Sequence, residues 1–176
     1  MSHLNENELR VFVDAIKHLF GQMTQYPAEI RSAYLGNSEI SQTLLGEGAD
    51  DTIGQSDDNY LPMPVNDYTG LIKVSGDYTG SVYFTAPRHM MLAFLLESGE
   101  TETTDSNLLD AVGEIANTIS GNVRQHFGET LEISPPVLCR GDRHLSSMGV
   151  RDRPFIINLA WQQYEASVVV DIDEVH

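Results

Sequence analysis

The stretch from Asp105 to Phe127, DSNLLDAVGEIANTISGNVRQHF, constrains the fold more than any other part of the chain. Its apolar residues recur at steps of three and four, which predicts a helix of about six turns with one buried face. They are Leu108, Leu109, Val112, Ile115, Ala116, Ile119, Val123 and Phe127. Asp105 or Ser106 is expected to cap the start of this helix, and Gly128 is expected to end it.

A polar stripe is predicted along the opposite side of the same helix. At about 100° per residue, its four members fall within about 60° of one another. They are Asp110, Glu114, Asn117 and Gly121. The side chains around the stripe are small, and a glycine inside a helix costs about 1 kcal/mol relative to alanine. These small residues are Gly113, Thr118, Ser120 and Gly121. We interpret the combination as a surface that another molecule approaches closely.

Length and composition favour one domain over residues 1–176. The 176 residues can bury one core, and 41% of them are hydrophobic, which is too many for a disordered chain. No apolar run approaches the ~18–20 residues of a membrane span, so no transmembrane helix is predicted. Cys139 has no second cysteine with which to form a disulfide, so nothing in the sequence indicates an oxidising compartment, and a cytoplasmic protein is expected. The net charge of −16 would repel nucleic acid and anionic membranes, which are therefore not expected as partners.

Three further segments complete the first half of the chain. Asn5–Met23 is predicted to be a second amphipathic helix, opened by a capping box of Asn5 and Glu8. Residues 36–64 hold six acidic residues and no Lys or Arg, which predicts an irregular acidic excursion. Tyr68–Thr85 contains the repeat YTGLIKVSG and YTGSVYFT and is predicted to form a β-hairpin that turns at Ser75-Gly76-Asp77.

The second half supplies the remaining strands. Pro135-Pro136 interrupts a strand over Glu129–Cys139 and confines it to a sheet edge or a bulge, because proline cannot donate to a ladder. Pro154–Gln162 and Tyr164–Ile172 are expected to close the chain as an antiparallel pair. The predicted class is α+β, with helices covering an antiparallel sheet.

Other kinds of site have weaker support. Asp110 and Glu114 lie one helical turn apart and could share a proton or a metal ion, but their predicted exposure argues against it. The six histidines show no metal-ligand spacing, so no metal site is predicted. Cys139 is interpreted as a small hydrophobic residue at a strand end, with a reactive thiol beside Arg140 as the alternative.

The residues of the long helix also carry a family resemblance. The pattern D-x-x-x-E-x-x-N, followed by small residues and a second asparagine, is present as DAVGEIANTISGN from Asp110 to Asn122. Together with the proline-containing strand ISPPVL (Ile133–Leu138), it resembles the CheC/CheX/FliY family of response-regulator phosphatases. CheX, which has one such helix, is the closer match, and the resemblance extends over Tyr68–Ile172. It implies an antiparallel sheet covered by two long helices that pack side by side.

The resemblance further implies a function and a site. The protein would be a phosphatase that docks on a phosphorylated CheY-type receiver domain, in chemotaxis or another two-component pathway. Glu114 would pair with a lysine of the receiver, and Asn117 would orient a water molecule toward the aspartyl phosphate, with Asp110 and Gly121 as further partner-binding residues. The protein would have no cofactor of its own, because the receiver would supply Mg²⁺. The alternatives are a non-catalytic module that binds a receiver or flagellar switch, and a purely structural dimer domain.

A homodimer is also expected from the resemblance to CheX. The sequence adds one observation, since Phe155–Trp161 and Ser167–Val170 are continuous apolar runs. An uncovered sheet edge within either run would tend to pair with a second copy.

Overall fold

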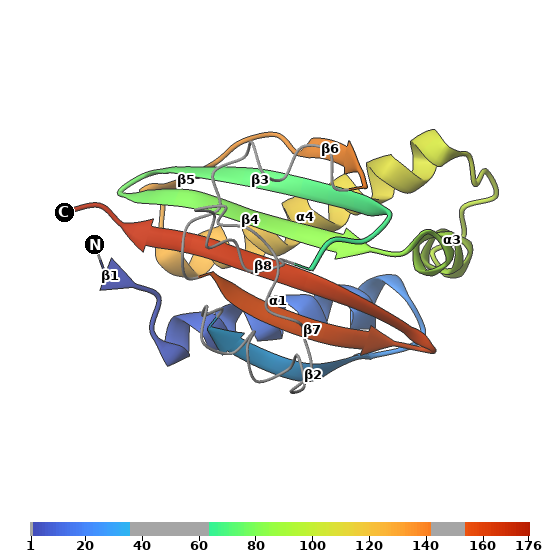
Figure 1. The fold of residues 1–176 in the computed structure, drawn as a ribbon, viewed down its shortest axis with the longest axis horizontal. Helices are drawn as coiled ribbons and strands as arrows, with labels where there is room; N and C mark the ends of the chain where they lie inside the picture. The colour runs from blue at the N-terminus through green and yellow to red at the C-terminus, as the bar shows by residue number, and fades with distance from the viewer. Residues whose placement is uncertain (1, 36–63, 142–153) are drawn as a thin grey trace, which may run out of the picture.

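A computed structural model describes residues 2–35, 64–141 and 154–176 of the chain (Figure 1). In chain order these residues form β1 (Ser2–His3), α1 (Glu6–Met23), β2 (Ala28–Leu35), β3 (Tyr68–Gly76), β4 (Tyr78–Ala86), α3 (Arg88–Glu97), α4 (Asp105–Phe127), β5 (Leu131–Ile133), β6 (Val137–Arg140), β7 (Phe155–Trp161) and β8 (Tyr164–Glu174). The predicted acidic excursion at 36–64 lies, except for its last residue, outside the described residues.

The strands form one antiparallel sheet in the order β2-β7-β8-β4-β3. Both β5 and β6 pair with the outer side of β3, and β1 pairs with the end of β8. The predicted hairpin is confirmed as β3 and β4, with the turn at Gly76, whose φ is +95°. A Cβ at Gly76 would collide with the carbonyl oxygen of Thr130, so this turn requires glycine. These features confirm the α+β class.

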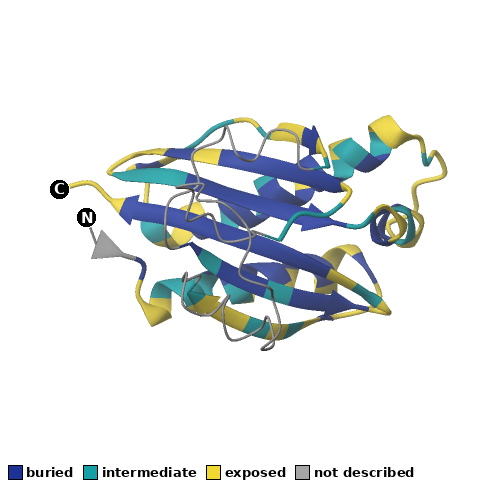
Figure 2. Cartoon of the chain, viewed as in Figure 1, coloured by how far each residue is buried: buried dark blue, intermediate teal, exposed yellow. Residues whose placement is uncertain are grey.

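The two continuous apolar runs near the end of the chain are interior strands. Strand β7 lies between β2 and β8, and β8 lies between β7 and β4, so neither offers a free edge in the part of the sheet that is described. Their apolar residues are continuous because both faces of these strands are buried, as Figure 2 shows for most of β8. The sequence argument that linked these runs to dimer formation is therefore wrong.

The two long helices lie side by side on one face of the sheet, behind it in Figure 1. Helix α1 begins with the predicted capping box, in which Asn5 accepts from the backbone N–H of Glu8 and the Glu8 carboxylate accepts from that of Asn5. Near this end of α1, Phe12 packs against Phe127, the last residue of α4, and their ring centroids are 6.4 Å apart. This arrangement confirms the packing that the resemblance implies.

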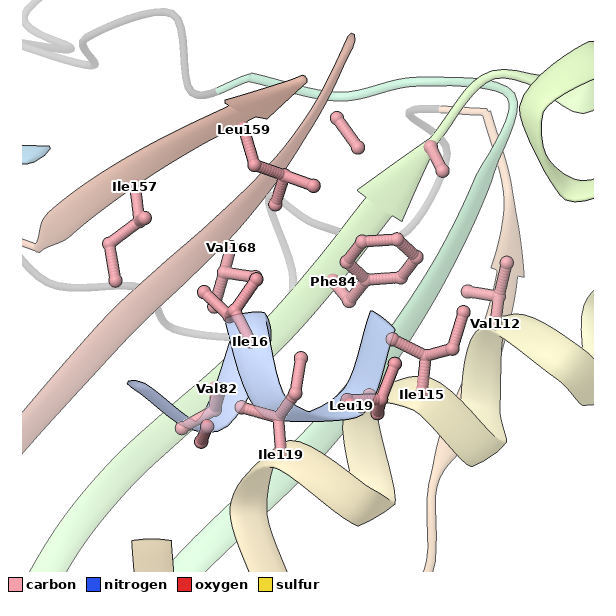
Figure 3. Close-up of a cluster of buried hydrophobic side chains, with 14 of the residues drawn as sticks. Ile16, Leu19, Val82, Phe84, Val112, Ile115, Ile119, Ile157, Leu159 and Val168 are labelled. Atoms are coloured by element: carbon pink, nitrogen blue, oxygen red, sulfur yellow. The ribbon is translucent and has the colours of Figure 1, made fainter. Parts of the chain in front are cut away.

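The core lies between these helices and the sheet. Figure 3 shows side chains from α1, α4, β4, β7 and β8 pointing toward one another. They include Ile16, Leu19, Val82, Phe84, Val112, Ile115, Ile119, Ile157, Leu159 and Val168. Burying apolar area stabilises the fold by roughly 25 cal/mol per Å². Because one face of α4 is buried in this core, the opposite face of the helix points toward solvent.

Candidate functional site

The start of α4 is fixed by Thr104 and not by the predicted Asp105 or Ser106. The Thr104 hydroxyl accepts a hydrogen bond from the backbone N–H of Asn107 at 3.3 Å, which makes Thr104 the N-cap residue. Asp105 has other partners that hold it in the first turn of the helix. The predicted end is confirmed, because Gly128 follows Phe127 with a φ of +95° and its N–H bonds the carbonyl of Arg124.

A polar cluster around Asp105 ties the helix to three other elements. The Tyr68 hydroxyl of β3 donates to one carboxylate oxygen of Asp105 at 3.0 Å. Arg88 of α3 lies 3.5 Å from the same oxygen, and Arg140 of β6 lies 3.4 Å from the other. Burial raises the pKa of Tyr68, and the hydrogen bond to Asp105 adds to this effect. The aspartate thus orients the first turn of α4 on β3, α3 and β6.

The predicted polar stripe forms on the outward face of α4. Asp110 and Glu114 are exposed, whereas Asn117 and Gly121 are half-buried. Within the described residues, the side chains of Asp110, Glu114 and Asn117 form no hydrogen bond or ion pair. Glu114 and Asn117 are three positions apart, which corresponds to a rise of about 4.5 Å along the helix axis. A carboxylate and an amide are therefore available together to an approaching molecule.

The small residues around this stripe have two different roles. Gly113 is buried, and a Cβ there would lie 2.5 Å from Leu138 Cδ2 and 3.3 Å from Pro136 Cβ. Ser120 is also buried, at 2% exposure. Their small size serves packing within the protein, so the prediction that a partner approaches them closely is wrong for both. At Gly121, in contrast, a Cβ would have nothing within 4 Å.

Sequence reasoning missed Gly70 of β3, which lies on the buried side of α4. A Cβ at Gly70 would lie 2.8 Å from the Val112 carbonyl oxygen and 2.9 Å from Gly113 Cα. The helix backbone therefore rests directly on the strand, one residue before Glu114. The repeated Tyr-Thr-Gly of the hairpin is the signal that could have identified this position.

A shallow hollow continues the stripe toward the C-terminal end of α4. Its volume is about 410 Å³, and it is lined by Gly121, Arg124, Gln125, Gly128, Glu129 and Ile133. Its lining comes from the last turns of α4, the segment after the helix and β5. The helical period predicts Gly121 at this surface, but no sequence pattern indicates the hollow or the place of Arg124 in it.

Other sites considered from the sequence are not assembled in the described structure. Within residues 2–35, 64–141 and 154–176, no three His, Cys, Asp or Glu side chains are grouped so as to hold a metal ion. Cys139 is 3% exposed, and burial raises its pKa, so the alternative of a reactive thiol is contradicted. No helix among the described elements is long and apolar enough to cross a membrane.

Comparisons with known proteins connect this fold and helix to one family. The family model "Chemotaxis phosphatase CheX" matches residues 68–160, which is more than half of the chain. No curated protein sequence matches the chain. The matched region contains the hairpin, the whole of α4 and the proline-interrupted edge.

Solved structures share the fold over nearly the whole chain. The chemotaxis protein CheX from Desulfovibrio desulfuricans has a TM-score of 0.71 and 18% identity, with 96% of this chain and 99% of that chain covered. CheX from Vibrio vulnificus has a TM-score of 0.67 and 17% identity, with 95% and 99% covered. The CheX–CheY–BeF₃–Mg²⁺ complex from Borrelia burgdorferi has a TM-score of 0.59 and 15% identity, with 97% and 100% covered. From the family match and the architecture together, the chain belongs to the chemotaxis phosphatase CheX family.

Proposed function

We propose that Glu114 and Asn117 are the docking and catalytic residues with which this chemotaxis phosphatase dephosphorylates a CheY-type receiver domain. The reaction class follows from membership of the CheX family. The observation that supports these two residues is their position on the outward face of α4, with side chains that have no partner within the described residues. The rigid core face behind them would keep their spacing fixed during docking.

Asn117 would act on the attacking water. An aspartyl phosphate is a reactive acyl phosphate, and phosphoryl transfer has a loose transition state, so orientation of the nucleophile is the main contribution a protein can make. The Asn117 amide has both a donor and an acceptor, and it can hold a water molecule in line with the phosphorus. Attack by that water breaks the bond between phosphorus and the aspartate oxygen, which releases inorganic phosphate and restores the carboxylate. No strong base is required at this position.

Glu114 would supply the docking contact. An exposed carboxylate can form a charge pair with a lysine of the receiver, which sets the register of the helix against the phosphorylation site. Asp110, one turn earlier, would lie at the border of the same contact, as would Gly121. A similar enzyme from Borrelia burgdorferi was crystallised with CheY, BeF₃ and Mg²⁺. By analogy, we expect Mg²⁺ to reach the reaction as a component of the receiver.

The test is phosphate release from a receiver labelled with acetyl phosphate. Asn117→Ala should abolish the acceleration and leave receiver binding within about threefold, because the lost interaction exists only in the transition state. Glu114→Lys should weaken binding, most strongly at low salt. Asn7→Ala, which removes an exposed amide from α1, is the matched control and should behave as wild type.

Two outcomes would contradict this assignment. Wild-type turnover in Asn117→Ala would exclude the water-positioning role, and wild-type affinity in Glu114→Lys would exclude the docking role. A wild-type protein that bound the phosphorylated receiver without accelerating phosphate release would instead be a non-catalytic receiver-binding module.

We also propose a homodimer and a cytoplasmic location. The dimer is supported by the resemblance to CheX, and the location by the intracellular site of receiver signalling. Because β7 and β8 are interior, a second copy would have to use another surface, such as the outer side of β2. Light scattering at micromolar concentration that gave the mass of one chain, 19.5 kDa, would refute the dimer.

A further inference from the structure

The hollow at the C-terminal end of α4 contains the one arginine that has no carboxylate partner among the described residues. Five arginines are described, and four of them form ion pairs: Arg10 with Glu6, Arg31 with Glu29, and both Arg88 and Arg140 with Asp105. Arg124 is exposed and forms none, although Glu129 lines the same hollow. In a chain with 26 acidic and ten basic residues, an arginine without a carboxylate partner is unexpected.

Arg124 lies on the same line of the helix as the proposed catalytic residue. Asn117 and Arg124 are seven residues apart, so they differ by only about 20° around the axis and are separated by about 10.5 Å along it. Gly121 lies between them, with nothing within 4 Å of the position of its Cβ. A protein interface of ordinary size buries about 800 Å² per partner, which is more than enough to extend over this distance.

Gly121 lines the hollow and leaves open space between Asn117 and Arg124. Glycine inside a helix is destabilising relative to alanine, and no neighbouring atom in the described structure requires it at this position. This distinguishes Gly121 from Gly113, where Leu138 and Pro136 leave no room for a Cβ. Glycine at position 121 keeps the hollow open toward solvent, beside an available guanidinium group.

We propose that this hollow is a second docking point for the same receiver domain, which places an acidic side chain against Arg124 and its backbone close to Gly121. The proposal rests on the proposed function, because the receiver is positioned by Glu114 and Asn117. A guanidinium group forms strong, often bidentate hydrogen bonds with a carboxylate, so an acidic side chain of the receiver is the group that would complement Arg124. The contact would offset part of the repulsion between the receiver and a chain with a net charge of −16.

The test measures KM and kcat for receiver dephosphorylation in two variants, each with a matched control. Gly121→Leu fills the hollow, and Gly21→Leu makes the same change in α1, where a Cβ also has nothing within 4 Å. Arg124→Gln removes the charge, and Arg10→Gln removes one from an exposed position of α1. We expect Gly121→Leu to raise KM at least tenfold and Arg124→Gln to raise it about three- to tenfold, each with kcat within twofold of wild type. The effect of Arg124→Gln should shrink at ~0.5 M salt, and both controls should keep the wild-type KM.

The proposal is overturned if Gly121→Leu and Arg124→Gln both keep a KM within twofold of wild type while Asn117→Ala is inactive. In that case α4 would bind the receiver without any contribution from the hollow. Active Asn117→Ala would instead contradict the proposed function. Unfolding temperatures exclude a folding defect as the cause of a raised KM, because replacing a glycine that has open space around it should not lower them. If Gly121→Leu were nevertheless unstable, Arg124→Gln alone would decide, and an unchanged KM in that variant would overturn the proposal.

Discussion

Replacement of Gly70 by alanine should separate α4 from the sheet at the turn that carries the site. The added Cβ would lie 2.8 Å from the Val112 carbonyl oxygen, 2.9 Å from Gly113 Cα and 3.0 Å from Gly113 N, whereas ordinary contacts begin at 3.4 Å. All three atoms belong to the backbone, so no side chain can rotate to make room. The helix would have to move by about 0.6 Å, and overpacking of this kind typically costs 1–3 kcal/mol.

The expected result is a loss of about 2 kcal/mol in the free energy of unfolding, which corresponds to a Tm lower by about 4–8 °C for a chain of this size. Urea unfolding and thermal unfolding both measure it. The control is Gly121→Ala, the same substitution on the outer side of the same helix, which should stabilise the protein by about 1 kcal/mol through helix propensity. Because Glu114 follows the displaced backbone directly, kcat/KM should also fall in Gly70→Ala. A Gly70→Ala variant as stable as wild type would show that helix and strand are not in backbone contact.

Two further predictions concern the cap of α4 and the buried thiol. Thr104→Ala should lower the free energy of unfolding by about 1 kcal/mol, because the N–H of Asn107 loses its acceptor; equal urea midpoints for the variant and wild type would contradict the cap. Cys139 should not react with a thiol reagent at neutral pH in the native protein and should react once urea unfolds it, since burial raises its pKa above the ordinary 9.0. Because the pKa of Cys139 is raised in the folded state, the folded protein holds this proton more tightly than the unfolded chain does. The resulting contribution to the free energy of unfolding is present below pH 9.0 and is lost as the pH rises above it. Urea unfolding of wild type and Cys139→Ala on both sides of pH 9.0 would detect this loss as a change in the difference between their stabilities.

Features that depend on neighbours in the sequence could be predicted before the structure was known. The capping box of Asn5 and Glu8, the end of α4 at Gly128 and the turn at Gly76 all depend on bonds or backbone angles within a few residues. The outward stripe with Glu114 and Asn117 follows in the same way from the helical period. These features determine which residues of α4 face solvent, and the same residues carry the pattern by which the family resemblance was recognised.

The choice between nearly equivalent local residues was decided by tertiary contacts. Thr104 caps α4 because Asp105 is held by Tyr68, Arg88 and Arg140, which are at least 17 positions away in the chain. The continuous apolar runs could have been edge or interior strands until the pairing of β8 with β4 enclosed one of them and the pairing of β7 with β2 enclosed the other. Periodicity describes one element at a time, so it cannot show which element lies against it.

Gly113 and Gly121 of α4 also show that periodicity does not reveal which element lies against a residue. From the sequence, Gly113 and Gly121 are equivalent small residues beside a polar stripe. In the structure, Leu138 of β6 and the preceding Pro136 pack against Gly113, whereas Gly121 and Arg124 both line a hollow. The sequence determined the helix, its two faces and the pair of residues proposed for catalysis, because these depend on bonds within about four residues. Only the tertiary structure decided which glycine has open space in front of it, because that depends on the strand packed beside the helix.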